Sequence, residues 1–126
     1  MAAPNIVNVT SIIGMTTAVS IGNTNTMNVL ISNSSDSSIV LKINTILAAN
    51  DDDGLGNVEV TVKVFNQAAG AGTSFSLANS IVVPYQSSIV LLGKDSPIYL
   101  TENMSISAAA SAANDVDIIC SYEEIS

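Results

Sequence analysis

Residue types on which catalysis and nucleic-acid binding depend are missing from this chain. Histidine, arginine and tryptophan are absent, and the only cationic side chains are three lysines among 126 residues. Lys42, Lys63 and Lys94 are too scattered to form the cluster of positive charge that neutralises phosphates. The sequence therefore predicts no nucleic-acid partner and, by the same reasoning, no attachment to an anionic membrane surface.

The absence of histidine also excludes the commonest arrangements for nucleophilic catalysis. Without histidine, neither a Ser-His nor a Cys-His nucleophile pair can form. The single cysteine, Cys120, falls on the apolar face of a predicted strand, where it is interpreted as a small core residue. Glu123 and Glu124 are adjacent, so on a strand their side chains point to opposite sides. They therefore do not form the pair of facing carboxylates that acid–base catalysis of glycoside cleavage requires. We therefore predict a protein that is not an enzyme and uses no cofactor.

Signals for secretion or membrane insertion are also missing. One cysteine cannot form an internal disulfide, and the opening Met-Ala-Ala-Pro-Asn-Ile-Val has no basic stretch before an apolar run. No apolar stretch approaches the roughly 20 residues that span a bilayer. We expect a protein that is made and used from a cytoplasm.

Charge is scarce, and what there is is acidic. Charged residues make up 11% of the chain, and the net charge is −8, whereas soluble domains typically carry about 25% charged residues. Serine, threonine and asparagine supply the polar surface instead, and such groups cost less to desolvate than charges do. Because interface cores are depleted of charge, this favours a protein covered by neighbours. A free monomer with a polar coat remains the alternative.

What the chain has in abundance is the period-two alternation of half-buried strands. The clearest case is 57–65, where valines at 58, 60, 62 and 64 share one face. In 38–47 the predicted apolar face carries Ile39, Leu41, Ile43 and Leu47. In 103–111 the serines at 105 and 107 fall on the polar face, and in 116–123 Cys120 falls on the apolar one.

Other segments are less regular. We expect strands at 6–13 and 16–21 separated at Gly14, and others at 27–31, 80–83 and 97–100. The nearly continuous apolar run 87–92 is predicted to be buried on both faces. Ala69-Gly70-Ala71-Gly72 is predicted to be a flexible hairpin tip. The pattern predicts a single all-β domain over residues 1–126, an antiparallel β-sandwich or jelly roll of about 8–10 short strands.

Metal ligands are sparse. Zinc sites need Cys or His clusters, which the chain lacks. Asp51, Asp53 and Asn57 offer oxygen ligands for calcium, but Ala49 occupies the first ligand position of an EF-hand loop and the downstream glutamate is missing. We interpret this stretch as an acidic turn between two strands and predict no metal site.

Two stretches of the sequence carry a resemblance. They are the opening 1–14, MAAPNIVNVTSIIG, and the closing segments GKDSPIYL at 93–100, SAAASAAND at 107–115 and CSYEEIS at 120–126. Together they resemble small virion structural proteins of tailed phages, especially those of marine cyanobacteria. The resemblance implies a particle component assembled in the host cytoplasm. It brings no functional residues and leaves capsid, neck, tail and fibre open.

These observations lead to a virion structural protein, and within that class to a capsid decoration or cement protein that binds the assembled shell. Its expected partners are the major capsid protein or other virion proteins, together with further copies of itself. We expect residues 1–13 to form a docking strand or arm. The expected contact residues are Ala2, Pro4, Ile6, Val7, Val9 and Ile12. The alternatives are a neck, tail or fibre-attachment subunit, and a receptor- or glycan-binding module.

Overall fold

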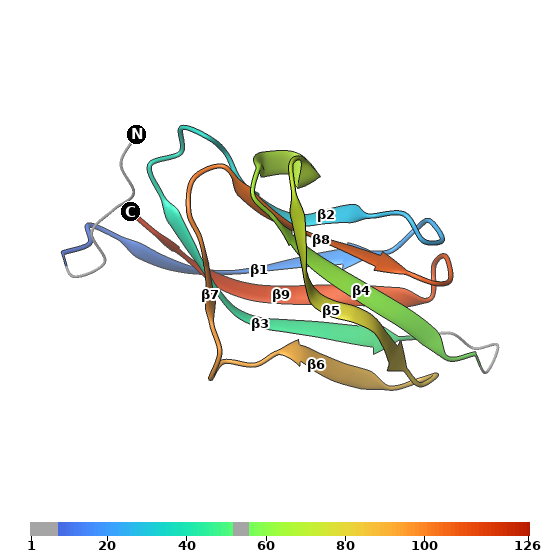
Figure 1. Cartoon of the computed structure of the whole chain (residues 1–126). Helices are drawn as coiled ribbons and strands as arrows, with labels where there is room; N and C mark the ends of the chain where they lie inside the picture. The colour runs from blue at the N-terminus through green and yellow to red at the C-terminus, as the bar shows by residue number, and fades with distance from the viewer. Residues whose placement is uncertain (1–7, 52–55) are drawn as a thin grey trace.

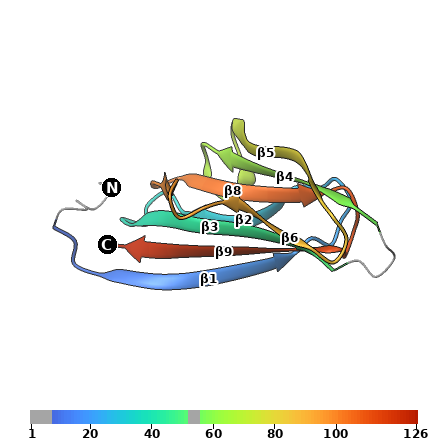
Figure 2. The same ribbon diagram turned by 90° about the horizontal axis from the view of Figure 1, so that it is seen from below.

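The computed structural model describes residues 8–51 and 56–126, in which two antiparallel sheets pack face to face (Figures 1 and 2). Sheet A has the strand order β1-β9-β3-β6, with β7 also pairing β3, and sheet B has the order β2-β8-β4-β5. The elements are β1 (Ile12–Ser20), β2 (Asn28–Asn33), β3 (Val40–Asn50), β4 (Val58–Phe65), the 3-10 helix η1 (Ala68–Gly70), β5 (Ser74–Val83), β6 (Ser88–Leu92), β7 (Ile98–Leu100), β8 (Met104–Ala110) and β9 (Val116–Ile125). The predicted all-β sandwich is confirmed.

An aliphatic core fills the space between the sheets. Val58, Val60 and Val62 of β4 are fully buried, as the alternation of that segment predicts. From sheet A, Ile118 and Cys120 of β9 enter the same core. Each buried aliphatic side chain contributes about 1.5–3 kcal/mol relative to an exposed one, so regular alternation on the central strands largely sets which face of each strand turns inward.

Two buried asparagines tie together the ends of the sandwich. The Nδ2 group of Asn33 donates to the backbone oxygens of Ile39 and Leu100, both at 3.0 Å. The Nδ2 group of Asn50 donates to the oxygen of Val83 at 2.9 Å. Because buried carbonyls need donors, each asparagine stabilises the strand ends whose carbonyl oxygens it binds.

The face assignment of β3 is wrong beyond its middle. The pairing of β3 with β9 shifts register between Ile43 and Thr45. Such a bulge adds one residue and reverses the alternation after it. Ile46 is therefore fully buried in the core, whereas Leu47, which the regular pattern places inward, lies on the opposite face.

Two strand predictions in sheet A are also corrected. Gly14 does not separate two strands, because β1 runs through it from Ile12 to Ser20. The run 87–92 is not buried on both faces: β6 is an edge strand, and Val90 in its centre is 63% exposed. The predicted short strand at 97–100 is confirmed as β7, which pairs with β3.

Candidate assembly surfaces

The outer face of sheet B is partly covered by the chain itself. The β4–β5 connection, predicted to be a flexible tip, folds as η1 against β2 and β8. The backbone N–H of Gly70 donates to Ser105 Oγ at 2.9 Å, and that hydroxyl donates to the oxygen of Gln67 at 2.8 Å. As a result Ser105 and Ser107, predicted to lie on an exposed polar face, are 0% and 1% exposed.

The outer face of sheet A carries an apolar row that crosses four strands. Residues opposite one another in neighbouring strands share a face, and the registers place one side chain from each strand in line. The members of this apolar row are Ala18 of β1, Ile119 of β9, Leu47 of β3 and Val90 of β6. Ile119 and Val90 are 37% and 63% exposed. An exposed apolar line across a whole sheet is typical of a surface that meets another surface.

Small polar side chains border the apolar row. On one side, Thr16, Ser121 and Thr45 stand in register. On the other side the equivalent line is formed by Ser20, Asp117, Ala49 and Ser88. The hydroxyl groups at these positions cost less to remove from water than charges do. The carboxylate of Asp117 is the group at this border whose burial is costly.

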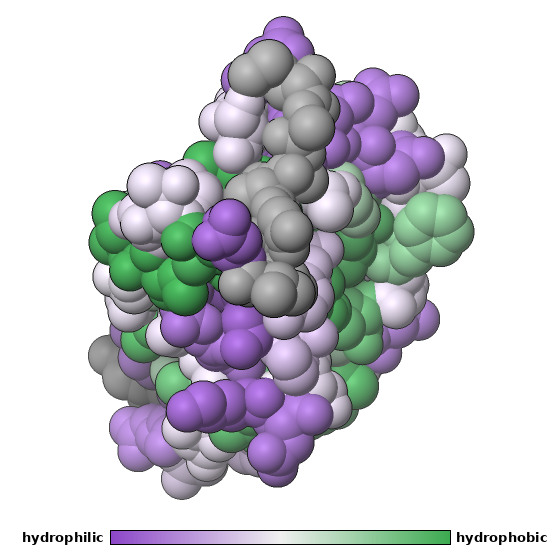
Figure 3. Space-filling model, turned by 90° about the vertical axis from the view of Figure 1, so that its left-hand side faces the viewer, coloured by the Kyte–Doolittle hydropathy of each residue, from purple (hydrophilic) through white to green (hydrophobic). Residues whose placement is uncertain are grey.

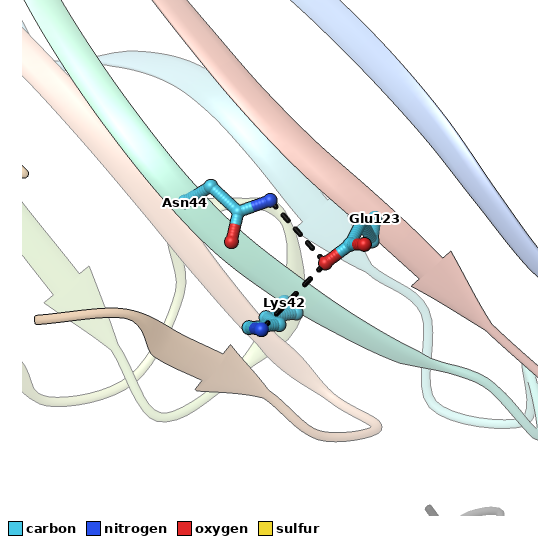
Figure 4. A network of polar contacts seen from close by, with 3 residues as sticks. All are labelled: Lys42, Asn44 and Glu123. Atoms are coloured by element: carbon cyan, nitrogen blue, oxygen red, sulfur yellow. Dashed lines mark hydrogen bonds and ion pairs between the residues drawn. The ribbon is translucent and has the colours of Figure 1, made fainter. Parts of the chain in front are cut away.

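Charges on this face are few and partly paired. Lys42 Nζ lies 3.8 Å from Glu123 Oε2, and Asn44 Nδ2 donates to the same oxygen at 3.3 Å (Figure 4). Lys42 and Glu123 are also direct partners in the β3–β9 register. Since both side chains are about one-third exposed, the pair adds little stability. It nevertheless leaves this part of the face with no net charge.

Strand β1 forms one free edge of sheet A. It pairs with β9 over nine consecutive residues without a register shift. Ile12, Ile13 and Met15 in its first half are 54%, 52% and 41% exposed. The end of the sandwich that carries the C-terminus shows hydrophobic side chains on both flanks (Figure 3). Exposed apolar groups on a free edge make β1 a second candidate contact surface.

The predicted docking residues fall partly within the described structure. Ala2, Pro4, Ile6 and Val7 lie outside the described residues. Val9 is half-buried, and the next two residues donate backbone N–H groups to the oxygen of Ser126, Thr10 at 2.7 Å and Ser11 at 3.0 Å. Ile12 already belongs to β1, where it faces Ile125. The docking role of 1–13 remains a prediction.

The calcium candidates do not form a described cluster. Asp51 is exposed, and Asn57 Oδ1 accepts a hydrogen bond from the backbone N–H of Tyr85 at 3.3 Å; Asp53 lies outside the described residues. Across 8–51 and 56–126, no three acidic, cysteine or histidine side chains are grouped so as to hold a metal ion.

Cys120 occupies the predicted core position. Burial raises the pKa of its thiol from 9.0 to about 11. Burial, the charge of Glu124 and interaction with Cys120 also raise the pKa of Tyr122. A thiol with such a pKa is almost entirely protonated at neutral pH, so Cys120 is a poor nucleophile.

The edges and the apolar row could not be read from the sequence. Their residues come from segments far apart in the chain, and only strand pairing brings them into line. The available signal was valine and isoleucine on strands with an alternating pattern. Alternation alone does not say which face of a strand is covered.

Comparisons with known proteins give no family. No protein-family model and no curated protein matches the chain. A solved structure from a family of disulfide-linked pili, the endospore appendages of Bacillus, is 18% identical, with a TM-score of 0.48 over 92% of this chain and 88% of that chain. The xylanase 10B fragment of Clostridium thermocellum with its CBM22-1 and GH10 modules is 11% identical, with a TM-score of 0.34 over 89% of this chain. This chain spans only 24% of that xylanase chain, and neither likeness indicates a function.

No helix among the residues that the structure describes has the length and apolar character needed to cross a membrane.

Proposed function

We propose that this protein is a non-enzymatic structural module of a larger assembly, and specifically a virion structural protein that decorates or cements an assembled capsid. The observation that carries the proposal is the apolar row on the outer face of sheet A. It stands on a solvent-facing sheet surface of a protein whose net charge is −8.

The apolar row gains free energy when another surface covers it. Left in water, Val90 and Ile119 expose apolar area that folding has not used. Covering either side chain fully contributes on the order of 1 kcal/mol. A single copy bound in this way is held weakly, but a regular shell presents many equivalent sites, and occupancy of the assembled state stabilises it by mass action.

The distribution of acidic groups supports an orientation. Asp36 and Asp95 are exposed in turns between strands, and Glu59 is exposed on the opposite sheet. With the outer face of sheet A against a shell, these carboxylates remain in solvent and need no partner. Desolvating these carboxylates would cost several kcal/mol each. The outer face of sheet A itself carries the Lys42–Glu123 pair and Asp117, so a shell surface that covers this face must leave Asp117 at the solvated rim or supply it with a partner.

Strand order supports a finer statement about the fold. The paths β1-β9-β3-β6 and β2-β8-β4-β5 interleave in the manner of a jelly roll, an architecture found in viral capsid and lectin domains. Architecture does not assign function. It is compatible with the resemblance of the opening and closing segments to tailed-phage virion proteins, and the two together favour the virion over other assemblies.

Matched lysine substitutions on the two outer faces test the docking surface. Val90→Lys places a charge in the apolar row, whereas Val82→Lys places the same charge on the outer face of sheet B, opposite Glu59. Purified variant protein is added to particles that lack the chain, and bound copies are counted by quantitative mass spectrometry. We expect Val90→Lys to lower the affinity at least about tenfold, since about 1.4 kcal/mol corresponds to a factor of ten, and Val82→Lys to bind normally. Equal binding by both variants contradicts the assigned face.

Copy number separates capsid decoration from the alternative virion sites. A protein spread over a symmetric shell is expected in a simple ratio to the major capsid protein. A neck, tail or fibre-attachment subunit is expected in far fewer copies. Binding of the free protein to glycan arrays, without particle association, would instead favour a receptor- or glycan-binding module.

A further inference from the structure

The four sheet edges of the sandwich differ in how well they are protected against pairing with another chain. Strand β2 has six residues and a register shift, and β6 has five residues and a register shift. Strand β5 is longer, but its pairing with β4 shifts register twice. Bulges and short length are established protections of an edge. Strand β7, which also pairs β3 beside β6, has three residues. Among the edge strands of residues 8–51 and 56–126, only β1 has neither protection, with nine residues in unbroken register.

The backbone of β1 shows which groups face outward. At its two ends, Ser11 exchanges hydrogen bonds with Ser126, and the N–H of Ile21 donates to the oxygen of Val116. In an antiparallel pair the residues that bond to the partner alternate with those that do not. Odd-numbered residues of β1 therefore bond to β9, and the even-numbered residues direct their N–H and C=O groups away from it. The outward set is Ile12, Gly14, Thr16, Ala18 and Ser20.

The side chains of β1 offer no obstacle to pairing. Residues 1–35 of the sequence contain no charged side chain and β1 contains no proline, so the charge and proline that normally guard an edge strand are missing. Ile13 and Met15, on the side of β1 that faces sheet B, remain 52% and 41% exposed. A long, regular, apolar edge of this kind is a template for another strand.

Gly14 supplies an independent observation. Glycine in a strand interior weakens the strand and often marks a bulge or a close approach of another backbone. Strand β1 has no bulge at Gly14, and a Cβ added there would meet nothing within 4 Å. The described residues therefore give no steric reason for glycine at this position, and the open space beside Gly14 leaves room for another strand.

We propose that β1 pairs antiparallel with β1 of a second copy across a twofold axis at Thr16. This register sets Thr16 against its own counterpart, Gly14 against Ala18 and Ile12 against Ser20. Every outward N–H and C=O of β1 then has a partner, which gives about ten new backbone hydrogen bonds. On the other side of the strand, the exposed Ile13 meets Val19 and the exposed Met15 meets Thr17 of the second copy.

Self-complementarity of β1 favours a second copy over a different protein, and the absence of charged side chains on β1 permits it. Two copies with a net charge of −8 each repel one another wherever their carboxylates approach. An uncharged edge is where that repulsion is smallest, and a twofold contact needs only one self-complementary strand. The pairing joins the two copies of sheet A into one continuous sheet, whose outer faces, each with its apolar row, lie side by side. The inference therefore rests on the proposed assembly role and deepens it.

Charge-swap variants at Thr16 test both the pairing and its register. Sedimentation and multi-angle light scattering are run on the full chain alone, in about 0.15 M salt so that long-range repulsion is screened. We expect the parent protein to form dimers, and Thr16→Lys or Thr16→Glu alone to weaken dimerisation at least tenfold because like charges then face one another. Mixing the two variants should restore a heterodimer. Ser88→Lys on β6, the other edge of sheet A, is the matched control and should dimerise like the parent.

A proline variant separates loss of pairing from loss of folding. Thr16→Pro removes an outward N–H that β9 does not use, so the monomer should keep its thermal midpoint while the dimer is lost. Thr16→Val keeps the N–H and should dimerise normally. A parent protein that stays monomeric at millimolar concentration, a dimer unaffected by Thr16→Pro, or a Lys and Glu mixture that stays monomeric would each overturn the proposal. Since no particle takes part, these outcomes are distinct from a failure to bind a shell.

Discussion

Replacing Asn33 by alanine should destabilise the sandwich far more than the same change at Asn28, although both residues belong to β2. Asn33 is 1% exposed, and its Nδ2 group serves the backbone oxygens of Ile39 and Leu100, each at 3.0 Å. Its Oδ1 accepts a hydrogen bond from the hydroxyl of Ser37. One side chain thus links the end of β2 to the start of β3 and the end of β7.

The magnitude follows from the groups left behind. A buried polar group that loses its partner costs about 1–3 kcal/mol, and Asn33→Ala strands two carbonyl oxygens. We expect a loss of about 3 kcal/mol from a free energy of unfolding of roughly 5–15 kcal/mol. For a domain of this length that corresponds to a fall of about 10 °C in the midpoint of thermal unfolding.

Asn28 provides the matched control. Its Nδ2 group donates to the oxygen of Thr26 at 2.8 Å, in an exposed bond two residues apart. Water replaces such a bond, so Asn28→Ala should cost no more than about 0.5 kcal/mol. Thermal and urea unfolding followed by circular dichroism measure both variants. Equal midpoints for the two variants, or an Asn33→Ala midpoint within 2 °C of the parent, would refute the role given to Asn33.

Two further predictions concern buried groups. Ser105→Ala removes the acceptor of Gly70 N–H and the donor to the Gln67 oxygen. The change should cost about 1–3 kcal/mol and raise amide hydrogen exchange in η1, and unchanged exchange there would contradict the anchoring of η1 by Ser105. Cys120 should react with thiol reagents at pH 8 only as the protein unfolds, since burial raises its pKa to about 11. Because the raised pKa favours the neutral thiol, its stabilisation is complete below about pH 9 and falls as the pH rises toward 11, by about 2–3 kcal/mol. Cys120→Ala should lose that part of the pH dependence, while burial and the charge of Glu124 still raise the pKa of Tyr122 in the variant. Identical curves for parent and variant would count against the burial argument.

The central strands could be predicted because their alternation is regular and one face is buried. Val58, Val60 and Val62 in β4 and Ile118 in β9 all turn inward as expected. A one-residue bulge does not show in the alternation of the sequence. Ile46 therefore occupies the inward position of β3 that the pattern assigns to Leu47. The fold class survived this error because it depends on many strands and not on one register.

Edge strands and covered faces could not be predicted, because they depend on which strands pair. The apolar run around Val90 has the composition of a doubly buried strand, yet β6 lies at an edge. Ser105 and Ser107 have the composition of a solvent face, yet η1 covers them. The apolar row has the same origin, since its four members are aligned only by the β1–β9, β9–β3 and β3–β6 registers.

Quantitative mass spectrometry of purified particles, with this chain measured against the major capsid protein, tests the central claim most directly. The account predicts a ratio near one or a simple fraction such as one third, as a lattice-wide component requires. A few to a few tens of copies per particle would contradict capsid decoration and move the protein to the neck, tail or fibres. Complete absence from the particles would contradict the virion role itself.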